Sequence, residues 1–423
     1  MKLTKCKLGE LVNVTRGMSL SGQYYSEEGE LIRLTLGNFN MNGGGFKKNT
    51  SKSDLYFTGP VREEFILKKG DIITPLTEQS LGLLGTTARI PENGKYIQSQ
   101  DVALVKCKPG KIDPNFCYYL VSSHSVKQQL SAAAQQTKIR HTSPEKIMNC
   151  TVWVPELQEQ ERIGALLTAI DSKIELNCSI NRNLESLAKQ LYDYWFVQFD
   201  FPDENGRPYK SSGGKMVWNE VLKREIPIAW KSGAFSDIAN ITMGQSPDGS
   251  SYNEKGEGIV FYQGSTDFGI RFPSVRMYTT SPSRYAKQGD ILMSVRAPVG
   301  AVNIANSDCC IGRGLSAINS KKGSVTYIYY VIHYLKVRFD SLNTAGTTFG
   351  SITKDELFSL PVVIPSEKIL ERFEAICKPI FNKQMEIGFE IESLTRQRDE
   401  LLPLLMNGQI TVNSDLSNIL ILY

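Results

Sequence analysis

The amino-acid sequence presents one order of signals twice, and this duplication limits the folds that the chain can adopt. The first copy occupies residues 8–195 and the second occupies residues 234–405. Each copy begins with a short apolar stretch that ends in glycine, at residues 11–17 (LVNVTRG) and 238–244 (IANITMG). Self-similarity over so long a period indicates two copies of one structural unit. A chain of 423 residues is long enough for two such domains, since one domain takes roughly 100–200 residues.

The middle of each copy contains a glycine–aspartate pair followed by aliphatic residues. These segments are residues 69–73 (KGDII) and 288–292 (QGDIL), and strand-like runs precede them at residues 32–36 and 259–262. Glycine and aspartate favour a turn, and the aliphatic residues after them favour a buried strand. We therefore interpret the two aspartates as turn residues and not as catalytic carboxylates.

Each copy closes with a helix start and a strand that ends in proline. Ser143 precedes Pro144, and Thr353 occupies the matching place 210 residues later. Serine and threonine are favoured N-cap residues, and proline suits the first helical position. The strands at residues 151–155 (TVWVP) and 361–365 (PVVIP) are separated by the same 210 residues.

A long amphipathic helix is predicted after each proline. Apolar residues recur there with a period of 3.5, which favours a coiled coil over an ordinary core helix. Two such helices in one chain can pair with each other, and a pseudo-two-fold relation between the copies would make the pair antiparallel. The predicted helix–helix seam consists of Ile163, Leu167, Ile170, Ile174, Leu184, Leu191, Phe373, Ile380, Ile387, Ile391, Leu394 and Leu401.

Four polar residues interrupt this seam, and two interpretations of them stay open. They are Asn177, Asn181, Gln384 and Arg398. Buried polar residues of a coiled coil can set its register. Alternatively, they are contact points for a partner protein. Near the end of the second helix, Pro403 is expected to bend or fray the helix and Gly408 to stop it.

These signals together predict an α+β fold. We expect two similar α/β domains separated by two long helices that form an antiparallel coiled coil, with a pseudo-two-fold internal repeat. The sequence has no signal-peptide pattern and no apolar run of membrane-spanning length. Eight cysteines without a Cys-x-x-Cys pair indicate reduced thiols, with neither a zinc site nor a disulfide framework. We therefore expect a cytoplasmic protein that does not contact a membrane.

The order of these elements resembles the specificity subunits of type I restriction-modification enzymes. Residues 261–269 (FYQGSTDFG), 289–300 (GDILMSVRAPVG), 361–365 and 401–408 (LLPLLMNG) are also similar to phrases of that family. The resemblance covers almost the whole chain. It implies a sequence-specific DNA-binding subunit without catalytic activity, in which each globular domain reads one half of a split DNA site.

The resemblance also implies partners and cofactors outside this chain. The partners would be double-stranded DNA, two methyltransferase (modification) subunits docked on the helices, and motor-nuclease (restriction) subunits. S-adenosylmethionine and ATP would be bound by those subunits, and no cofactor or metal is expected here. The helices would set the spacer length, because about 40 residues span roughly 60 Å, or at most roughly 18 base pairs of DNA.

The resemblance divides the chain into six parts. The expected target-recognition domains comprise residues 1–154 and 233–364. The expected spacer helices comprise residues 155–200 and 365–408, with a linker at 201–232 and a C-terminal tail at 409–423. The two copies differ in detail, with PLTEQSLG at residues 75–82 where the second has SVRAPVG at residues 294–300. We therefore expect the two domains to read different sequences, which makes the target asymmetric.

Several polar and basic residues in loops are candidates for contact with DNA. Donors that reach base edges read sequence, while basic and hydroxyl groups fix phosphates. For any single candidate, an ordinary solvated loop residue is the slightly favoured alternative. We expect alanine at Lys138 and Arg140 to weaken binding of the first half-site and to lower its salt dependence. The candidates are Gln136, Thr137, Lys138, Arg140 and His141 in the first copy and Gln245, Gln263, Ser265, Arg296, Arg313, Thr347 and Thr348 in the second.

Two other functional classes compete with this interpretation. A nuclease or methyltransferase is disfavoured because the sequence lacks a Walker-type loop and an Asn-Pro-Pro-aromatic motif, and residues 113–116 (DPNF) read as a turn entering a helix. A stand-alone DNA-binding protein or coiled-coil scaffold without methyltransferase partners is the second. The net charge of +4 permits DNA binding but does not argue for it.

Overall fold

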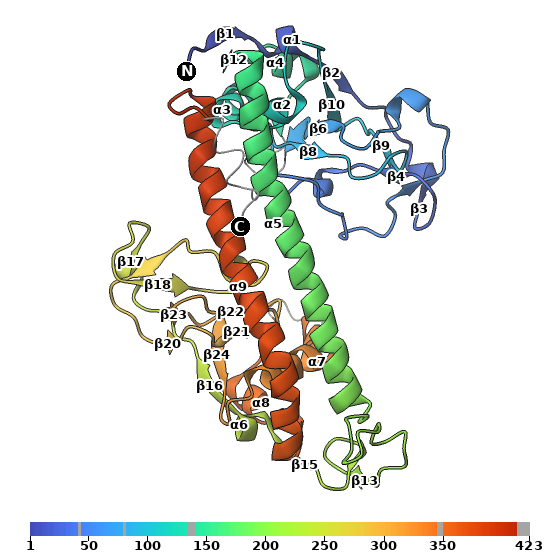
Figure 1. Ribbon diagram of the computed structural model, residues 1–423, viewed down its shortest axis with the longest axis vertical. Helices are drawn as coiled ribbons and strands as arrows, with labels where there is room; N and C mark the ends of the chain where they lie inside the picture. The colour runs from blue at the N-terminus through green and yellow to red at the C-terminus, as the bar shows by residue number, and fades with distance from the viewer. Residues whose placement is uncertain (41–43, 79–81, 134–139, 345–349, 413–423) are drawn as a thin grey trace. The chain divides into compact units, whose positions relative to one another are not determined.

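The computed structural model describes residues 1–40, 44–78, 82–133, 140–344 and 350–412. The chain folds into two compact units, and both long helices contribute to both of them (Figure 1). Unit 1 comprises Met1–Ile174 and Glu392–Tyr423, and unit 2 comprises Glu175–Ile391. Strands and helices mix in each unit, as an α+β fold requires.

Unit 1 contains two four-stranded sheets and two small two-stranded sheets. The first sheet has the order β2 (Val12–Arg16), β10 (Val102–Cys107), β6 (Ile72–Pro75) and β8 (Ala88–Arg89). The second has the order β3 (Tyr25–Ser26), β5 (Tyr56–Phe57), β4 (Ile32–Arg33) and β9 (Tyr96–Ile97). The small sheets pair β1 (Thr4–Lys7) with β12 (Thr151–Val154) and β7 (Thr77–Glu78) with β11 (Arg140–His141). Its short helices are α1 (Leu8–Leu11), α2 (Pro114–Val121), α3 (His124–Ala133) and α4 (Pro144–Met148).

Unit 2 follows the same plan, but its second sheet has five strands, and a single bridge between Arg296 and Ser351 stands where unit 1 pairs β7 with β11. Its first sheet has the order β16 (Ala239–Met243), β24 (Leu315–Ser320), β21 (Ile291–Ser294) and β22 (Val302–Ile304). The second has the order β17 (Tyr252–Asn253), β19 (Tyr278–Thr279), β18 (Ile259–Tyr262), β23 (Cys309–Ile311) and β20 (Tyr285–Ala286). The small sheets pair β15 (Lys231–Ala234) with β25 (Pro361–Ile364) and β13 (Met216–Asn219) with β14 (Arg224–Pro227). Besides the long helices, it contains α6 (Phe235–Ile238), the 20-residue α7 (Val325–Thr344) and α8 (Lys354–Phe358).

The two glycine–aspartate segments form the same turn in both units. Gly70 and Gly289 adopt φ angles of 89° and 87°, which glycine reaches without the steric cost of a side chain. The carboxylates close the turns, because the N–H groups of Lys68 and Lys287 donate to Asp71 and Asp290 over 2.8 Å each. Both turns lead into buried strands, β6 and β21. The aspartates are therefore structural, as predicted.

The predicted N-caps are also present. The Ser143 hydroxyl accepts the N–H of Lys146 at the start of α4, and the Thr353 hydroxyl accepts the N–H of Glu356 at the start of α8, over 3.3 Å each. Asp113 caps α2 with Pro114 at its first position, so residues 113–116 do enter a helix. The expected strand at residues 32–36 is wrong in its length: β4 ends at Arg33, and Thr35 caps a 3₁₀ turn, Leu36–Asn38, instead.

The long helices are α5 (Leu157–Tyr192), which continues as a π-helical turn at Asp193–Val197, and α9 (Glu367–Met406). Pro403 lies within the last turn of α9 without ending it. Gly408, whose φ is 70°, ends the helix. The N–H of Gly408 donates to the carbonyl of Leu405, and the N–H of Gln409 donates to the carbonyl of Leu404. Within the expected linker at 201–232, the chain forms the β13–β14 hairpin.

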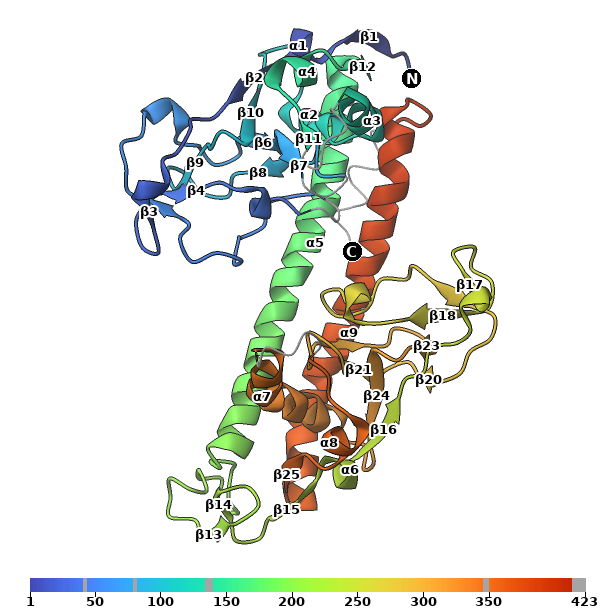
Figure 2. The same cartoon turned by 180° about the vertical axis from the view of Figure 1, so that it is seen from behind.

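The helices pair antiparallel within each unit (Figures 1 and 2). In unit 1, Arg398 of α9 donates to Asp171 of α5 over 3.0 Å. In unit 2, Gln384 of α9 donates to Glu185 of α5 over 2.9 Å. Residue numbers therefore rise along α5 while they fall along α9. Among the seam residues, Ile163, Leu167, Ile170, Phe373 and Ile387 are buried, and Ile174, Leu184, Leu191, Ile380, Ile391, Leu394 and Leu401 are half-buried.

The four polar residues that interrupt the seam are all buried. Arg398 and Gln384 bond across the helix pair, so their polar groups are satisfied inside the chain. The side-chain amides of Asn177 and Asn181 leave buried atoms without a hydrogen-bond partner. Two of the four thus act between the helices, which favours the register-setting interpretation over contact with a partner protein.

Candidate nucleic-acid interface

In unit 2, the ends of five strands bring four loops together. We call this the unit 2 junction: residues 244–246, 263–265, 295–297 and 312–314. Backbone hydrogen bonds fasten the loops to one another and to the strands. The N–H groups of Gly244, Gln245, Val295 and Gly312 donate to the carbonyls of Leu315, Ile311, Gly314 and Tyr262, over 2.9, 3.1, 3.0 and 2.8 Å respectively.

Unit 1 closes four loops in the same way. The unit 1 junction consists of residues 17–19, 35–37, 76–78 and 99–101. The N–H groups of Gly17, Met18, Leu76 and Val102 donate to the carbonyls of Val102, Gln98, Asp101 and Ser99, over 3.3, 3.2, 2.8 and 3.0 Å respectively. Each of these four bonds has a counterpart in unit 2. The counterpart of the bond from Val102 to Ser99 is the bond from the N–H of Leu315 to the carbonyl of Gly312, over 3.0 Å. The two junctions therefore share one backbone plan.

One glycine in each junction is required by this plan. A Cβ atom on Gly17 would lie 2.3 Å from the carbonyl oxygen of Gln98, and one on Gly244 would lie 2.1 Å from that of Gly312. Both neighbours are backbone atoms and cannot rotate away. These are the glycines with which the first apolar stretch of each repeat ends, so their place in the sequence repeat follows from loop closure.

The unit 2 junction gathers most of the DNA-binding candidates of the second copy. Gln245, Gln263, Arg296 and Arg313 each lie on a different loop, and all four are exposed. Ser265 is half-buried in the 3₁₀ turn Ser265–Asp267. Among the described residues, neither Arg296 nor Arg313 forms an ion pair, so both guanidinium groups are available to an anionic or hydrogen-bonding ligand. Thr347 and Thr348 lie outside the described residues.

The candidates of the first copy that the structure describes lie beside the unit 1 junction. Arg140 and His141 form β11, and the next residue, Thr142, donates its N–H to the carbonyl of Leu76 over 2.8 Å. His141 is exposed. Arg140 is more constrained, because its Nη1 donates to Ser131 over 3.1 Å and lies 3.9 Å from the Glu78 carboxylate. Gln136, Thr137 and Lys138 lie outside the described residues.

Glu78 explains how this edge of unit 1 is held. Its side chain is buried and accepts the N–H groups of Leu83 and Leu84 over 3.0 Å each. The half-buried guanidinium of Arg140 therefore partly compensates the charge of the buried Glu78 carboxylate. The expectation that Arg140 contributes to the salt dependence of binding is accordingly weaker than for a free arginine.

Sequence reasoning missed Gln100 and Asp101 at the unit 1 junction. Gln100 is exposed, and it helps to line a polar hollow of about 360 Å³ together with Arg33, Asn49 and Lys52. The sequence did contain a signal for Gln100. Gln100 stands two residues before β10, and Arg313 stands two residues before β24, which is the equivalent central strand of unit 2. Pairing the strands of the two copies in register would have placed these two residues together.

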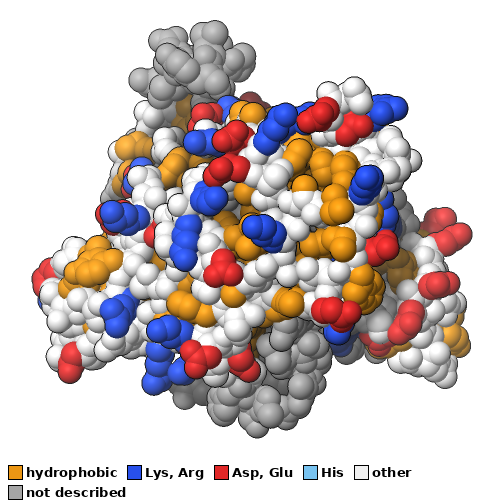
Figure 3. Space-filling view, turned by 90° about the horizontal axis from the view of Figure 1, so that it is seen from below, with side chains coloured by type: hydrophobic (Ala, Val, Ile, Leu, Met, Phe, Trp, Pro, Cys, Tyr) orange, Lys and Arg blue, Asp and Glu red, His pale blue; other side chains and the backbone are white. Residues whose placement is uncertain are grey.

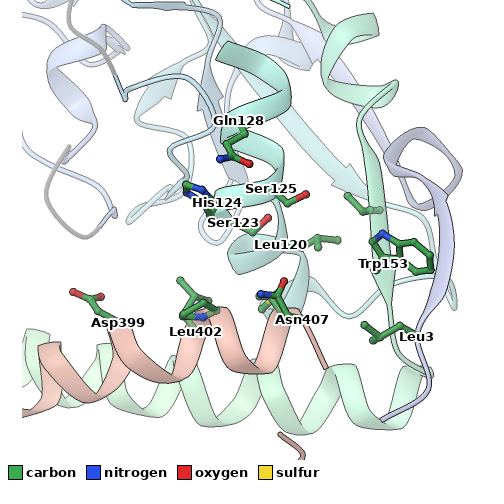
Figure 4. Close-up of a pocket in the computed structure, with 13 residues that line it drawn as sticks. Leu3, Leu120, Ser123, His124, Ser125, Gln128, Trp153, Asp399, Leu402 and Asn407 are labelled. Carbon is green, nitrogen blue, oxygen red and sulfur yellow. The ribbon is translucent and has the colours of Figure 1, made fainter. Parts of the chain in front are cut away.

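A larger hollow of unit 1 lies away from the junction. It has a volume of about 820 Å³ and is lined by side chains from α3, β12 and the end of α9, including His124, Trp153 and Leu402 (Figure 4). None of the junction residues lines it. The hollow therefore does not belong to the candidate interface.

Three general features of the described residues bear on the kinds of ligand that the chain can bind: surface charge, metal-binding groups and apolar helices. On the face seen in Figure 3, basic and acidic side chains are interspersed and no single broad basic patch is visible. Within the described ranges, no group of three or more His, Cys, Asp or Glu residues could hold a metal ion. None of the described helices combines the length and the apolar character that a membrane-spanning segment needs.

Comparisons with known proteins agree with this geometry. The model of the family "Type I restriction modification DNA specificity domain" matches residues 2–186 and 227–390, one match in each copy of the repeat. The MjaX protein of Methanocaldococcus jannaschii, provisionally described as a type I restriction enzyme specificity subunit, is 31% identical over 378 residues, which cover 85% of this chain and 84% of that protein.

Two further proteins are similar at lower identity. The type I restriction enzyme HindI specificity subunit of Haemophilus influenzae is 22% identical and covers 83% of this chain and 89% of its own length. The crystal structure of a type I restriction-modification S subunit from M. genitalium superposes with a TM-score of 0.59 at 18% identity, over 96% of both chains. This structure supports the fold. The matched model and the relative together show that this chain belongs to the family of type I restriction-modification DNA specificity subunits.

Proposed function

We propose that each junction contacts one half of a bipartite, asymmetric DNA site. The observation that carries this proposal is that the two junctions share their backbone hydrogen bonds but differ in their exposed side chains. A common backbone presents loops to DNA in the same way, whereas different donors and acceptors read different bases. Arg296 and Arg313 give unit 2 two cations that form no ion pair with any described residue, where unit 1 has Thr77 and Gln100 at the equivalent places.

We further propose that the helix pair sets the spacer between the half-sites and docks two methyltransferase subunits. A second apolar stripe on α5 supports docking. Leu176, Ile180 and Leu187 of α5 are all exposed, and their spacing places them on one face of the helix. An exposed apolar stripe on a long helix is typical of a protein–protein contact.

We assign the chemistry of modification and restriction to partner subunits. In this proposal, methyltransferase subunits bind S-adenosylmethionine, motor-nuclease subunits use ATP, and the present chain selects the DNA sequence without catalysis. Its own residues hold the two junctions and the helix pair.

The test is to map methylated bases in the host genome with and without this gene. We expect loss of methylation at one split, asymmetric motif on deletion, and its return on complementation. A second measurement is methyl transfer by the purified chain, alone and with its methyltransferase subunits. Activity only in the complex supports the proposal, whereas methylation by the chain alone, or no dependence of any motif on the gene, contradicts it.

A further inference from the structure

We infer that residue 313 of unit 2 and its equivalent, residue 100 of unit 1, each select one base of their half-site, with Arg313 reading guanine and Gln100 reading adenine. This inference rests on the proposed function and adds to it the residues and bases through which the two half-sites differ.

The equivalence of the two positions follows from backbone hydrogen bonds and not from sequence similarity. The residue before each position accepts an N–H from the central strand: Ser99 from Val102 and Gly312 from Leu315. The residue after each accepts an N–H from the loop that follows β6 or β21: Asp101 from Leu76 and Gly314 from Val295. Residues 100 and 313 are thus bracketed by the same two bonds.

Each loop presents this one side chain to solvent. In unit 2 the neighbours of Arg313 are glycines that pack on the adjacent loop. A Cβ atom on Gly312 would lie 3.1 Å from the Cα of Gln263, and a Cβ atom on Gly314 would lie 2.6 Å from the carbonyl oxygen of Gln263. In unit 1 the neighbours Ser99 and Asp101 are half-buried, while Gln100 is exposed. The closure of the junction therefore leaves residues 313 and 100 as the outward-facing groups of their loops.

The backbone beneath Arg313 is held in place. Its N–H donates to the hydroxyl of Ser246 over 3.3 Å, which joins two loops of the unit 2 junction. The side chain itself has no ion-pair partner among the described residues. A fixed backbone and a free guanidinium suit selective binding, because less freedom is lost when the contact forms.

The chemistry of the two side chains then decides between bases. The guanidinium fork of arginine matches O6 and N7 of guanine, and the amide of glutamine matches N6 and N7 of adenine, both in the major groove. One good bidentate contact changes the preference for a base by about 5- to 150-fold. A contact of Arg313 with phosphate is the competing role, and it would carry no base preference.

The experiment compares variants of the full complex with its methyltransferase subunits. Arg313→Gln and Arg313→Ala are tested for the motif that they methylate and for affinity to DNA over a salt series. Lys322→Gln is the matched control, because it removes the same charge from an exposed site beyond the opposite end of β24. That strand has six residues, so its ends lie roughly 20 Å apart.

For Arg313→Gln we expect one position of one half-site to lose its preference for guanine and shift towards adenine, while the other half-site stays unchanged. Arg313→Ala should relax the same position to all four bases. Gln100→Arg should alter one position of the other half-site. Lys322→Gln should leave the motif as it is.

Two outcomes overturn the inference while leaving the proposed function intact. One is an unchanged split motif in both Arg313 variants. The other is a uniform loss of affinity for all sequences with a salt slope lower by about one unit, which identifies a phosphate contact. If the unmodified complex itself methylates no split motif, the proposed function fails with it. Unchanged thermal unfolding and an intact second half-site show that each variant has folded.

Discussion

Unit 1 and unit 2 close their junctions with the same backbone bonds but tie their helices with different charges. In unit 1, Asp171 of α5 meets Arg398 of α9 over 3.0 Å and accepts the hydroxyl of Tyr119 over 2.7 Å. Burial, together with the Asp171 carboxylate, raises the pKa of Tyr119. The cation of this tie is therefore supplied by the long helix itself.

Unit 2 uses a cation from outside the helices. Arg271 lies in the loop after the 3₁₀ turn Ser265–Asp267, and its Nη1 is 3.3 Å from Glu185 of α5. The guanidinium also lies over the ring of Phe381 of α9, 4.6 Å from its centroid. The helix pair of unit 2 is thus bonded directly to the domain that carries its junction. The comparison teaches that the repeat preserves backbone closure, whereas the buried charges are arranged separately in each copy.

The largest expected effect breaks these ties. Arg271→Met removes a buried cation that pairs with Glu185 and lies over the rings of Phe381 and Tyr329. Glu185 keeps its hydrogen bond from Gln384, and we expect a loss of about 3 kcal/mol, confined to unit 2. Arg398→Met should cost about 2 kcal/mol in unit 1, because Asp171 keeps its bond to Tyr119. Hydrogen exchange of each unit measures both losses. Lys322→Met, at an exposed ion pair, serves as the control. If either arginine variant lowered the protection of both units equally, the ion pairs would not act locally.

The next effect concerns the two junction glycines. Gly244→Ala and Gly17→Ala each place a Cβ atom against a carbonyl oxygen, so we expect about 1–3 kcal/mol of destabilisation and loss of recognition at one half-site each, a different one for each variant. Gly249→Ala is the matched control, since its Cβ meets nothing within 4 Å. The methylated motif and the midpoint of unfolding are measured. Loss of the same half-site in both variants would refute two independent junctions.

A smaller difference between the units appears on acidification. His333 of α7 packs on Tyr329, and its Nε2 is buried without a hydrogen-bond partner. Burial lowers the pKa of His333 in the folded state. The contribution of neutral His333 to the free energy of unfolding is therefore fully present above the unfolded pKa of about 6.5, and it is lost as the pH falls below that value.

Exchange protection of unit 2 between pH 7.5 and 5.5 measures the effect. His333→Phe keeps an aromatic ring beside Tyr329 and removes the titrating nitrogens, so it should flatten the pH dependence of unit 2. A pH dependence that is equal in the two units, or that persists in His333→Phe, would show that other groups are responsible.

The smallest expected change in stability sharpens the comparison of the helices. Leu187 of α5 is exposed, and its counterpart 210 residues later is the polar Gln397. Leu187→Gln should change stability by no more than about 0.5 kcal/mol but should weaken the docking of a methyltransferase subunit. Analytical ultracentrifugation of the complex measures this, with Gln397→Ala as the control. Unchanged assembly would remove the α5 stripe from the docking surface.

Local signals predicted much of the fold because they act over a few residues. The caps Ser143 and Thr353 and the turns at Gly70 and Gly289 occur where expected, since each depends on hydrogen bonds within three or four residues. The strand predicted at residues 32–36 is shorter because the Asn38 side chain accepts the N–H of Thr35 and starts a 3₁₀ turn. A side chain that competes for the backbone is difficult to foresee from an apolar pattern.

The two related copies, each with a long helix that carries an apolar seam, can be recognised from the residue order alone, because repetition and periodicity are properties of that order. Which loops lie next to one another, in contrast, depends on the folded chain. The bonds that bracket Gln100 and Arg313 join segments such as residues 76 and 101, or 295 and 314, and no local preference specifies such pairs. The packing likewise places Arg140 beside buried Glu78, whereas Arg313 has no ion pair within the part of the chain that the structure describes, because the environment of a charge is set by residues distant in the sequence.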